Sequence, residues 1–119
     1  MLTIDPLYLR GLSLFDREEF YESHEVLEEL WKLTSGPSRL FIQALIHFAV
    51  AFYHQQQTNQ TGAKRQLQKA LRKLAGFLPL YQSIDTAALY REGLNALDRV
   101  SRGELLEQYL KIGAFRNPF

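Results

Sequence analysis

Residues 40–54 constrain the fold more than any other part of the chain, because they form an apolar run with very few polar positions. The run reads Leu-Phe-Ile-Gln-Ala-Leu-Ile-His-Phe-Ala-Val-Ala-Phe-Tyr-His. A helix that is apolar on nearly every side belongs in the interior of a bundle. The run is shorter than the roughly 20 residues of a membrane span and carries polar side chains, so we expect no membrane-spanning segment.

The polar side chains of this run are not scattered. Gln43, His47 and His54 stand at i, i+4 and i+11, so they fall within about 40° of one another around a helix. An unpaired polar group in a protein interior costs about 1–3 kcal/mol. We therefore expect this polar seam to find partners on a neighbouring helix.

Helical periodicity and capping residues predict an all-α fold. Asp5-Pro6, Asp16 followed by Glu19, and Asp85 are typical of helix starts. The predicted helices span residues 6–15, 17–33, 38–57, 61–76 and 86–100, with a short last helix that begins at the capping box of residues 101–104 and ends near residue 112. No segment shows the period-two alternation of a strand.

Short connections favour antiparallel neighbours, so we predict a compact bundle of five to six helices with residues 40–54 at its centre. Residues 6–33 and 38–76 form two helix pairs of tetratricopeptide size. They lack most of the spacing-specific residues of that repeat, which makes the likeness a loose one. The length of 119 residues predicts a single domain spanning residues 1–119, with residues 113–119 as an irregular C-terminal tail.

Charge and composition narrow the class of protein. The formal net charge is +1, and the basic residues of the segment 61–76 have no aromatic residues between them, so we expect no nucleic-acid binding. The chain has no cysteine, which excludes disulfides and thiolate sites and fits a reducing compartment. The N-terminus lacks the pattern of a signal peptide. We therefore expect a cytoplasmic protein.

The charges are unevenly distributed along the chain. Residues 16–32 hold seven acidic residues against two basic ones, whereas residues 55–83 hold five basic residues and no acidic one. Two interpretations are open: solvated helix faces that attract each other within the fold, or a basic docking surface for an acidic partner.

The predicted helix over residues 17–33 supplies the partner for the polar seam. Its inward stripe follows the helical period through Phe20, His24, Leu27 and Trp31. Glu28 stands one turn after His24 and can approach it at the i, i+4 spacing. If this helix packs antiparallel to residues 38–57, the pair faces the polar seam across a mostly apolar interior.

Three interpretations of His24, Glu28, Gln43 and His47 are open. The first is a satisfied core network that sets helix register. The second is a zinc, manganese or iron site with His24, Glu28 and His47 as ligands, although the spacing matches neither the metalloprotease nor the di-iron motif. The third is a small-molecule or peptide pocket in which His24 and its carboxylate neighbours bind the ligand or transfer protons.

A longer pattern of residues resembles a known family. It consists of Phe15, Phe20, Tyr21, His24, Glu25, Glu28 and Trp31, followed by Phe41, Gln43, Ala49, Tyr53 and His54. This pattern is similar to the domain of unknown function 309 over about residues 12–74. The resemblance implies a small all-helical protein of no established activity, with its motif at His24, Glu25, Glu28, Trp31, Gln43 and His54. Ala44 departs from the family, which usually has glycine after the glutamine.

We predict a non-enzymatic binding or scaffold protein that presents a groove to a protein or small-molecule partner. The alternative is a metal-dependent or acid–base enzyme, hydrolase-like, whose His24, Glu28 and His47 converge within about 5 Å around a cavity. Phe115 and Phe119 of the tail are predicted to dock on their own bundle; insertion into a neighbour's groove would instead give a homo-oligomer.

Overall fold

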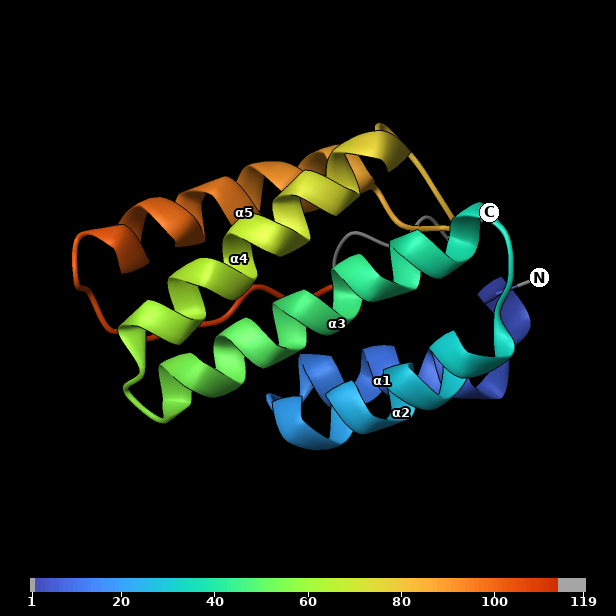
Figure 1. Ribbon diagram of the computed structural model, residues 1–119, viewed down its shortest axis with the longest axis horizontal. Coiled ribbons are helices and arrows are strands. Elements are labelled where there is room, and N and C mark those ends of the chain that lie inside the picture. Colours follow the sequence, from blue (N-terminus) through green and yellow to red (C-terminus); the bar gives the residue numbers. More distant parts are fainter. Residues whose placement is uncertain (1, 114–119) are drawn as a thin grey trace.

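The structure, a computed structural model, describes residues 2–113, and these residues form helices without any strand (Figure 1). The α-helices are α1 (Pro6–Asp16), α2 (Phe20–Leu33), α3 (Pro37–Gln56), α4 (Gln60–Leu74) and α5 (Thr86–Ser101), and the short 3₁₀ helices are η1 (Leu2–Ile4) and η2 (Ala75–Phe77). The predicted all-α bundle is therefore confirmed.

Helix α3 lies at the centre of the molecule. Figure 1 shows it between the α1–α2 pair on one side and the α4–α5 pair on the other, and its closest packing is with α2 and α4. Its buried residues are Phe41, Ile42, Ala44, Leu45, Ile46, Phe48, Ala49, Ala51, Phe52 and Gln55. Burial on nearly all sides is what its apolar sequence predicts.

Side-chain caps begin three of the helices. The Asp5 carboxylate accepts the Leu7 N–H at 2.8 Å, and the Asp85 carboxylate accepts the Ala88 N–H at 2.9 Å, as predicted. Asn59 caps α4 through the Gly62 N–H at 3.0 Å, so this helix begins one residue earlier than predicted. Each cap satisfies a backbone donor that has no partner within its own helix.

The capping box predicted at Asp16 is wrong. Asp16 is the last residue of α1, and α2 begins only after Glu19, whose side chain makes no capping bond. Between the helices Glu18 takes the left-handed conformation (φ 63°), which turns the chain back on itself. The Asp16 carboxylate accepts the N–H groups of Ile112 and Gly113 instead, both at 2.7 Å.

The short helix predicted after residue 101 is also wrong. The chain leaves α5 through Gly103 (φ 83°), and residues 104–113, the C-terminal segment, run without helix from the α5 side back towards α1 (Figure 1). The predicted docking of Phe115 and Phe119 falls on residues 114–119, which lie outside the described residues.

Two glutamine side chains hold the start of the C-terminal segment by its backbone. The Gln55 Oε1 accepts the Leu106 N–H at 2.7 Å, and its Nε2 donates to the Glu104 carbonyl at 3.4 Å. The Gln60 Nε2 donates to the same carbonyl at 2.8 Å. These tertiary bonds satisfy backbone groups that a helix would otherwise pair internally, and they explain why the segment is not helical.

Aromatic packing holds the middle of the C-terminal segment. The Tyr109 ring lies 5.1 Å from the ring of Phe20 on α2 and 5.3 Å from the ring of Phe52 on α3. Phe15 of α1 joins the same cluster, 5.0 Å from Phe20 and 5.8 Å from Phe52. Edge-to-face arrangements of this kind are favourable beyond the area that they bury. The segment thereby closes the bundle over α1, α2 and α3.

Candidate functional site

The buried face of α2 differs from the predicted stripe at two of its four positions. The buried residues are Phe20, Ser23, Leu27 and Leu30, whereas His24 and Trp31 lie at the edge of this face. Helix α1 sets this rotation. Gly11 approaches so closely that a Cβ there would lie 2.5 Å from a Leu27 methyl group, and the Ser23 hydroxyl donates to the Gly11 carbonyl at 2.8 Å.

Because His24 stands at this edge, it lines a pocket between α2 and α3. The α2–α3 pocket has a volume of about 200 Å³. It is lined by Phe20, Tyr21, His24, Val50, Tyr53 and His54. The Tyr21 ring lies 5.5 Å from that of Tyr53 and 5.6 Å from the His24 imidazole, and Tyr21 is 48% exposed. The pocket therefore has aromatic walls and opens to solvent.

An acidic groove adjoins this pocket along α2. It is lined by Tyr21, His24, Glu25, Glu28, Glu29 and Lys32. The His24 Nε2 lies 3.4 Å from a Glu28 carboxylate oxygen, and its Nδ1 lies 3.3 Å from the Tyr21 carbonyl. Since the Glu28 side chain is 50% exposed, the pair contributes little to stability. It orients the imidazole at the boundary between pocket and groove.

His47 faces α4 instead of this pocket. Its Nδ1 lies 2.7 Å from Gln66 Oε1, and its Nε2 lies 2.6 Å from Lys73 Nζ. The lysine ammonium is only a donor, so these partners assign an Nδ1–H that donates to Gln66 and an Nε2 that accepts from Lys73. Burial lowers the pKa of His47 below 6.5; the Gln66 bond opposes this shift, and the charges of Lys73 and Lys69 add to it.

This environment predicts a pH dependence of stability. The unfolded chain binds a proton at His47 more readily than the folded chain, so the free energy of unfolding falls as the pH drops from above 6.5 towards the lowered pKa. Urea unfolding at several pH values across this window measures the effect. The His47→Gln variant should show a smaller loss of stability than the natural chain; equal losses in both proteins would contradict the assignment.

The other predicted site residues occupy separate places. The Trp31 ring on α2 makes a cation–π contact with Arg39 on α3, whose guanidinium carbon lies 3.9 Å from the centre of the ring. The His54 Nδ1 lies 3.3 Å from Asn59 Nδ2 at the start of α4. Gln43 is half-buried on α3, and Glu25 is exposed on α2.

The structure brings together only part of the predicted cluster. His24 meets Glu28 and shares the α2–α3 pocket with His54, but His47 faces α4 and bonds to residues of that helix. Within residues 2–113, no group of three or more His, Cys, Asp or Glu side chains is arranged to hold a metal ion. The predicted three-ligand set of His24, Glu28 and His47 is thus not assembled.

The prediction of a buried His-Glu-Gln network is wrong, because none of the seven predicted site residues is buried. The polar residues buried in the described part of the chain are Ser23, Gln55 and Thr86. Gln55, the first residue of the run Gln55-Gln56-Gln57, was not among the predicted site residues. The available signal of its burial was its spacing, because Gln55 stands one helical turn after Ala51 on a buried face of α3.

The acidic residues of α2 and the basic residues of α4 lie apart in the fold. Figure 1 shows α2 and α4 on opposite sides of α3. Of the ion pairs between described residues, none joins α2 to α4. The acidic groove is therefore not neutralised by the basic helix of its own chain.

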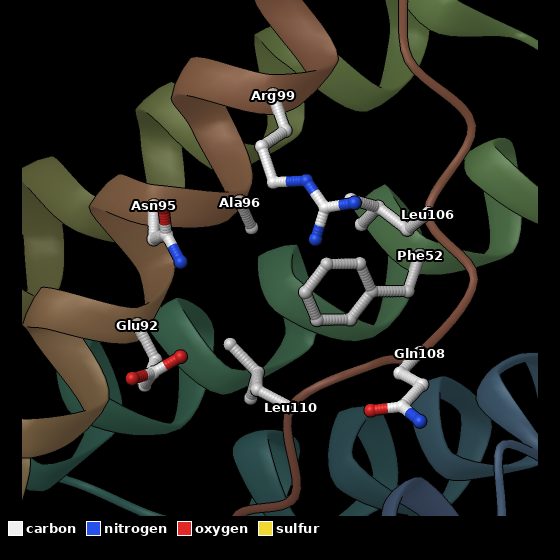
Figure 2. A pocket seen from close by; sticks show the side chains of 8 residues that line it. All are labelled: Phe52, Glu92, Asn95, Ala96, Arg99, Leu106, Gln108 and Leu110. Atoms are coloured by element: carbon white, nitrogen blue, oxygen red, sulfur yellow. The ribbon is translucent and has the colours of Figure 1, made fainter.

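A second pocket lies beneath the C-terminal segment. It is lined by Phe52, Glu92, Asn95, Ala96, Arg99, Leu106, Gln108 and Leu110 (Figure 2). The Arg99 side chain points into it in Figure 2, and its Nε donates to Glu104 at 3.2 Å. A volume of about 50 Å³ suits water better than an organic ligand. The α2–α3 pocket is therefore the better candidate site.

The part of the chain that forms this pocket matches a known family. Residues 8–66 match the family described as a domain of unknown function (DUF309). The uncharacterized protein YpuF of Bacillus subtilis (strain 168) is 39% identical over 57 residues, which are 47% of this chain and 33% of YpuF. This chain therefore spans about a third of the length of that relative. No helix of residues 2–113 is long and apolar enough to cross a membrane. Through residues 8–66, which hold most of α1, all of α2 and α3 and the first half of α4, the chain belongs to the DUF309 family.

Proposed function

We propose that this protein is a non-catalytic binding module, which receives one side chain of a protein partner in the α2–α3 pocket. The observation that carries the proposal is the pocket itself, an opening of about 200 Å³ with aromatic walls between α2 and α3. Pockets for drug-sized ligands have about 300–1,000 Å³. The smaller volume suits a single anchoring side chain, and such anchors dominate the energetics of many protein interfaces.

The construction of the pocket supports this role. Its walls come from α2 and α3, whose packing is held by buried residues such as Phe20, so the walls are present before a partner arrives. Tyr21 and Tyr53 supply large rings that lose little conformational entropy on binding. Preorganised aromatic walls of this kind favour binding because few groups must be ordered.

The hydrolase-like alternative has less support. It needs His47 next to His24 and Glu28, whereas His47 is bonded to Gln66 and Lys73.

The absence of cysteine fits a reducing compartment, which supports a cytoplasmic location for the binding module.

Selection from a random peptide library on phage tests the proposal, with a pocket variant as the counter-target. Val50→Phe places a larger side chain in the pocket, whereas Leu94→Phe makes the same kind of change on exposed α5, on the other side of α3. We expect selected peptides to bind the natural chain and the Leu94→Phe variant equally, and to bind Val50→Phe at least about tenfold more weakly. Selection that yields no Val50-dependent peptide would overturn the proposal.

A further inference from the structure

We propose that the group bound in the α2–α3 pocket is an alkylammonium, the side chain of a lysine or of a methylated lysine in the partner. This inference rests on the proposed function and names the chemistry of its ligand. It follows from two neighbouring features of α2: a corner of aromatic rings inside the pocket and unneutralised carboxylates at its mouth.

The aromatic corner suits a cation. The rings of Tyr21 and Tyr53 are inclined at 52° with their centres 5.5 Å apart, and Phe20 lines the same pocket. The face of an aromatic ring carries partial negative charge and attracts ammonium groups, most strongly where the cation is partly removed from water. Alkylated ammonium groups are less tightly hydrated, so they enter such a corner more readily.

The mouth of the pocket favours the same charge. Tyr21 and His24 line both the pocket and the acidic groove, so the two spaces adjoin each other. The groove has three carboxylates, Glu25, Glu28 and Glu29, against the single ammonium of Lys32. None of the described ion pairs links these carboxylates to a lysine or arginine of the chain. A positively charged ligand gains from this field, and a negatively charged one is repelled.

The apolar part of the pocket suits the rest of such a side chain. Val50 and Phe20 offer aliphatic and aromatic surface and no charge. A lysine carries four methylene groups below its ammonium and buries this stem along apolar surface while its charged end stays near water. A purely apolar side chain would use the walls but not the acidic mouth.

Four small probes of equal stem length separate these contributions. They are n-butylammonium, n-butyltrimethylammonium, the uncharged n-butanol and the anion pentanoate. Each is titrated into the natural chain, and the NMR signals of Tyr21, Tyr53 and His24 report binding. We expect both cations to bind about tenfold more tightly than n-butanol, and pentanoate to bind most weakly.

Two variants assign the preference to its sources. Tyr21→Leu keeps apolar contact but removes a ring face from an exposed position, so the cation preference should fall severalfold while n-butanol binding is retained. Glu28→Gln should weaken only the cations, by about threefold. Glu22→Gln is the matched control, because Glu22 lies exposed on α2 and lines neither the pocket nor the groove.

The outcomes distinguish this inference from the proposed function. If n-butanol binds as tightly as the cations and Val50→Phe abolishes both, the pocket is a binding site but the inference about charge is wrong. If no probe shifts the pocket signals while Val50-dependent peptides bind, the inference fails and the proposed function stands. If neither peptides nor probes bind, both are wrong.

Discussion

Replacement of Phe52 by alanine is expected to lower the free energy of unfolding by about 3–5 kcal/mol. Phe52 is fully buried on α3. Its ring meets aromatic rings from three other parts of the chain, namely Phe15 of α1, Phe20 of α2 and Tyr109 of the C-terminal segment. The lost transfer free energy is increased by the cavity left behind, because neighbours held by separate elements cannot all move in to fill it.

Thermal and urea unfolding of Phe52→Ala measure this effect, which corresponds to a fall of about 10–25 °C in Tm. Phe77→Ala is the control. Phe77 is half-buried against Phe41 and Tyr81 at the edge of the core, so its truncation should have clearly less effect. Equal losses in the two variants would contradict the central role of Phe52.

The position of α3 was predictable because it depends on composition alone. A helix with apolar residues on every side has only one kind of place in a bundle, whichever way it is rotated. The starts of α1 and α5 were predictable for a similarly local reason, since Asp5 and Asp85 bond to backbone groups within three residues of themselves.

The rotation of α2 was not predictable from its own sequence. A stripe through His24 and Trp31 and a stripe through Ser23 and Leu30 both fit the helical period. The choice between them depends on α1, since the Ser23 hydroxyl donates to the Gly11 carbonyl. A contact between helices therefore decides whether His24 lies in the core or at the edge of a pocket.

The residues of the polar seam on α3 face different neighbours, and the reason is comparable. Gln43, His47 and His54 share one side of the helix, but that side lies at the boundary between α2 and α4. Because the residues differ slightly in their angle around the helix, His47 bonds to Gln66 on α4, whereas His54 lines the α2–α3 pocket. The sequence predicts that polar groups need partners, and only the packing of three helices determines which partners they find.

The C-terminal segment shows how tertiary bonds overcome local helix signals. The pattern Ser101 to Glu104 has the residues of a capping box, but capping preferences are worth about 1 kcal/mol. Against this stand the bonds of the segment's backbone to Gln55 and to Asp16, which lie far away in the sequence. No local pattern records such partners.

Gln55→Met is therefore expected to lower the free energy of unfolding by about 2–3 kcal/mol and to loosen the start of the C-terminal segment. Methionine retains the length of the side chain but has neither the acceptor for the Leu106 N–H nor the donor for the Glu104 carbonyl. The Oε1 of Gln60 also loses the donor that Gln55 supplies, while the Nε2 of Gln60 keeps its bond to the Glu104 carbonyl. Polar groups left without partners in a buried position carry most of the expected loss.

Hydrogen exchange of the Leu106 amide is the most direct measurement, because this group donates to Gln55 itself. Its exchange should accelerate in Gln55→Met by more than the change in global stability explains. Gln57→Met is the matched control, because Gln57 lies exposed just after the end of α3, and a change within about 0.5 kcal/mol is expected there. If Leu106 stays protected in Gln55→Met, then Gln60, the packing of Tyr109 and the bonds to Asp16 are enough to hold the segment. The bonds of Gln55 would then follow the path of the chain instead of determining it.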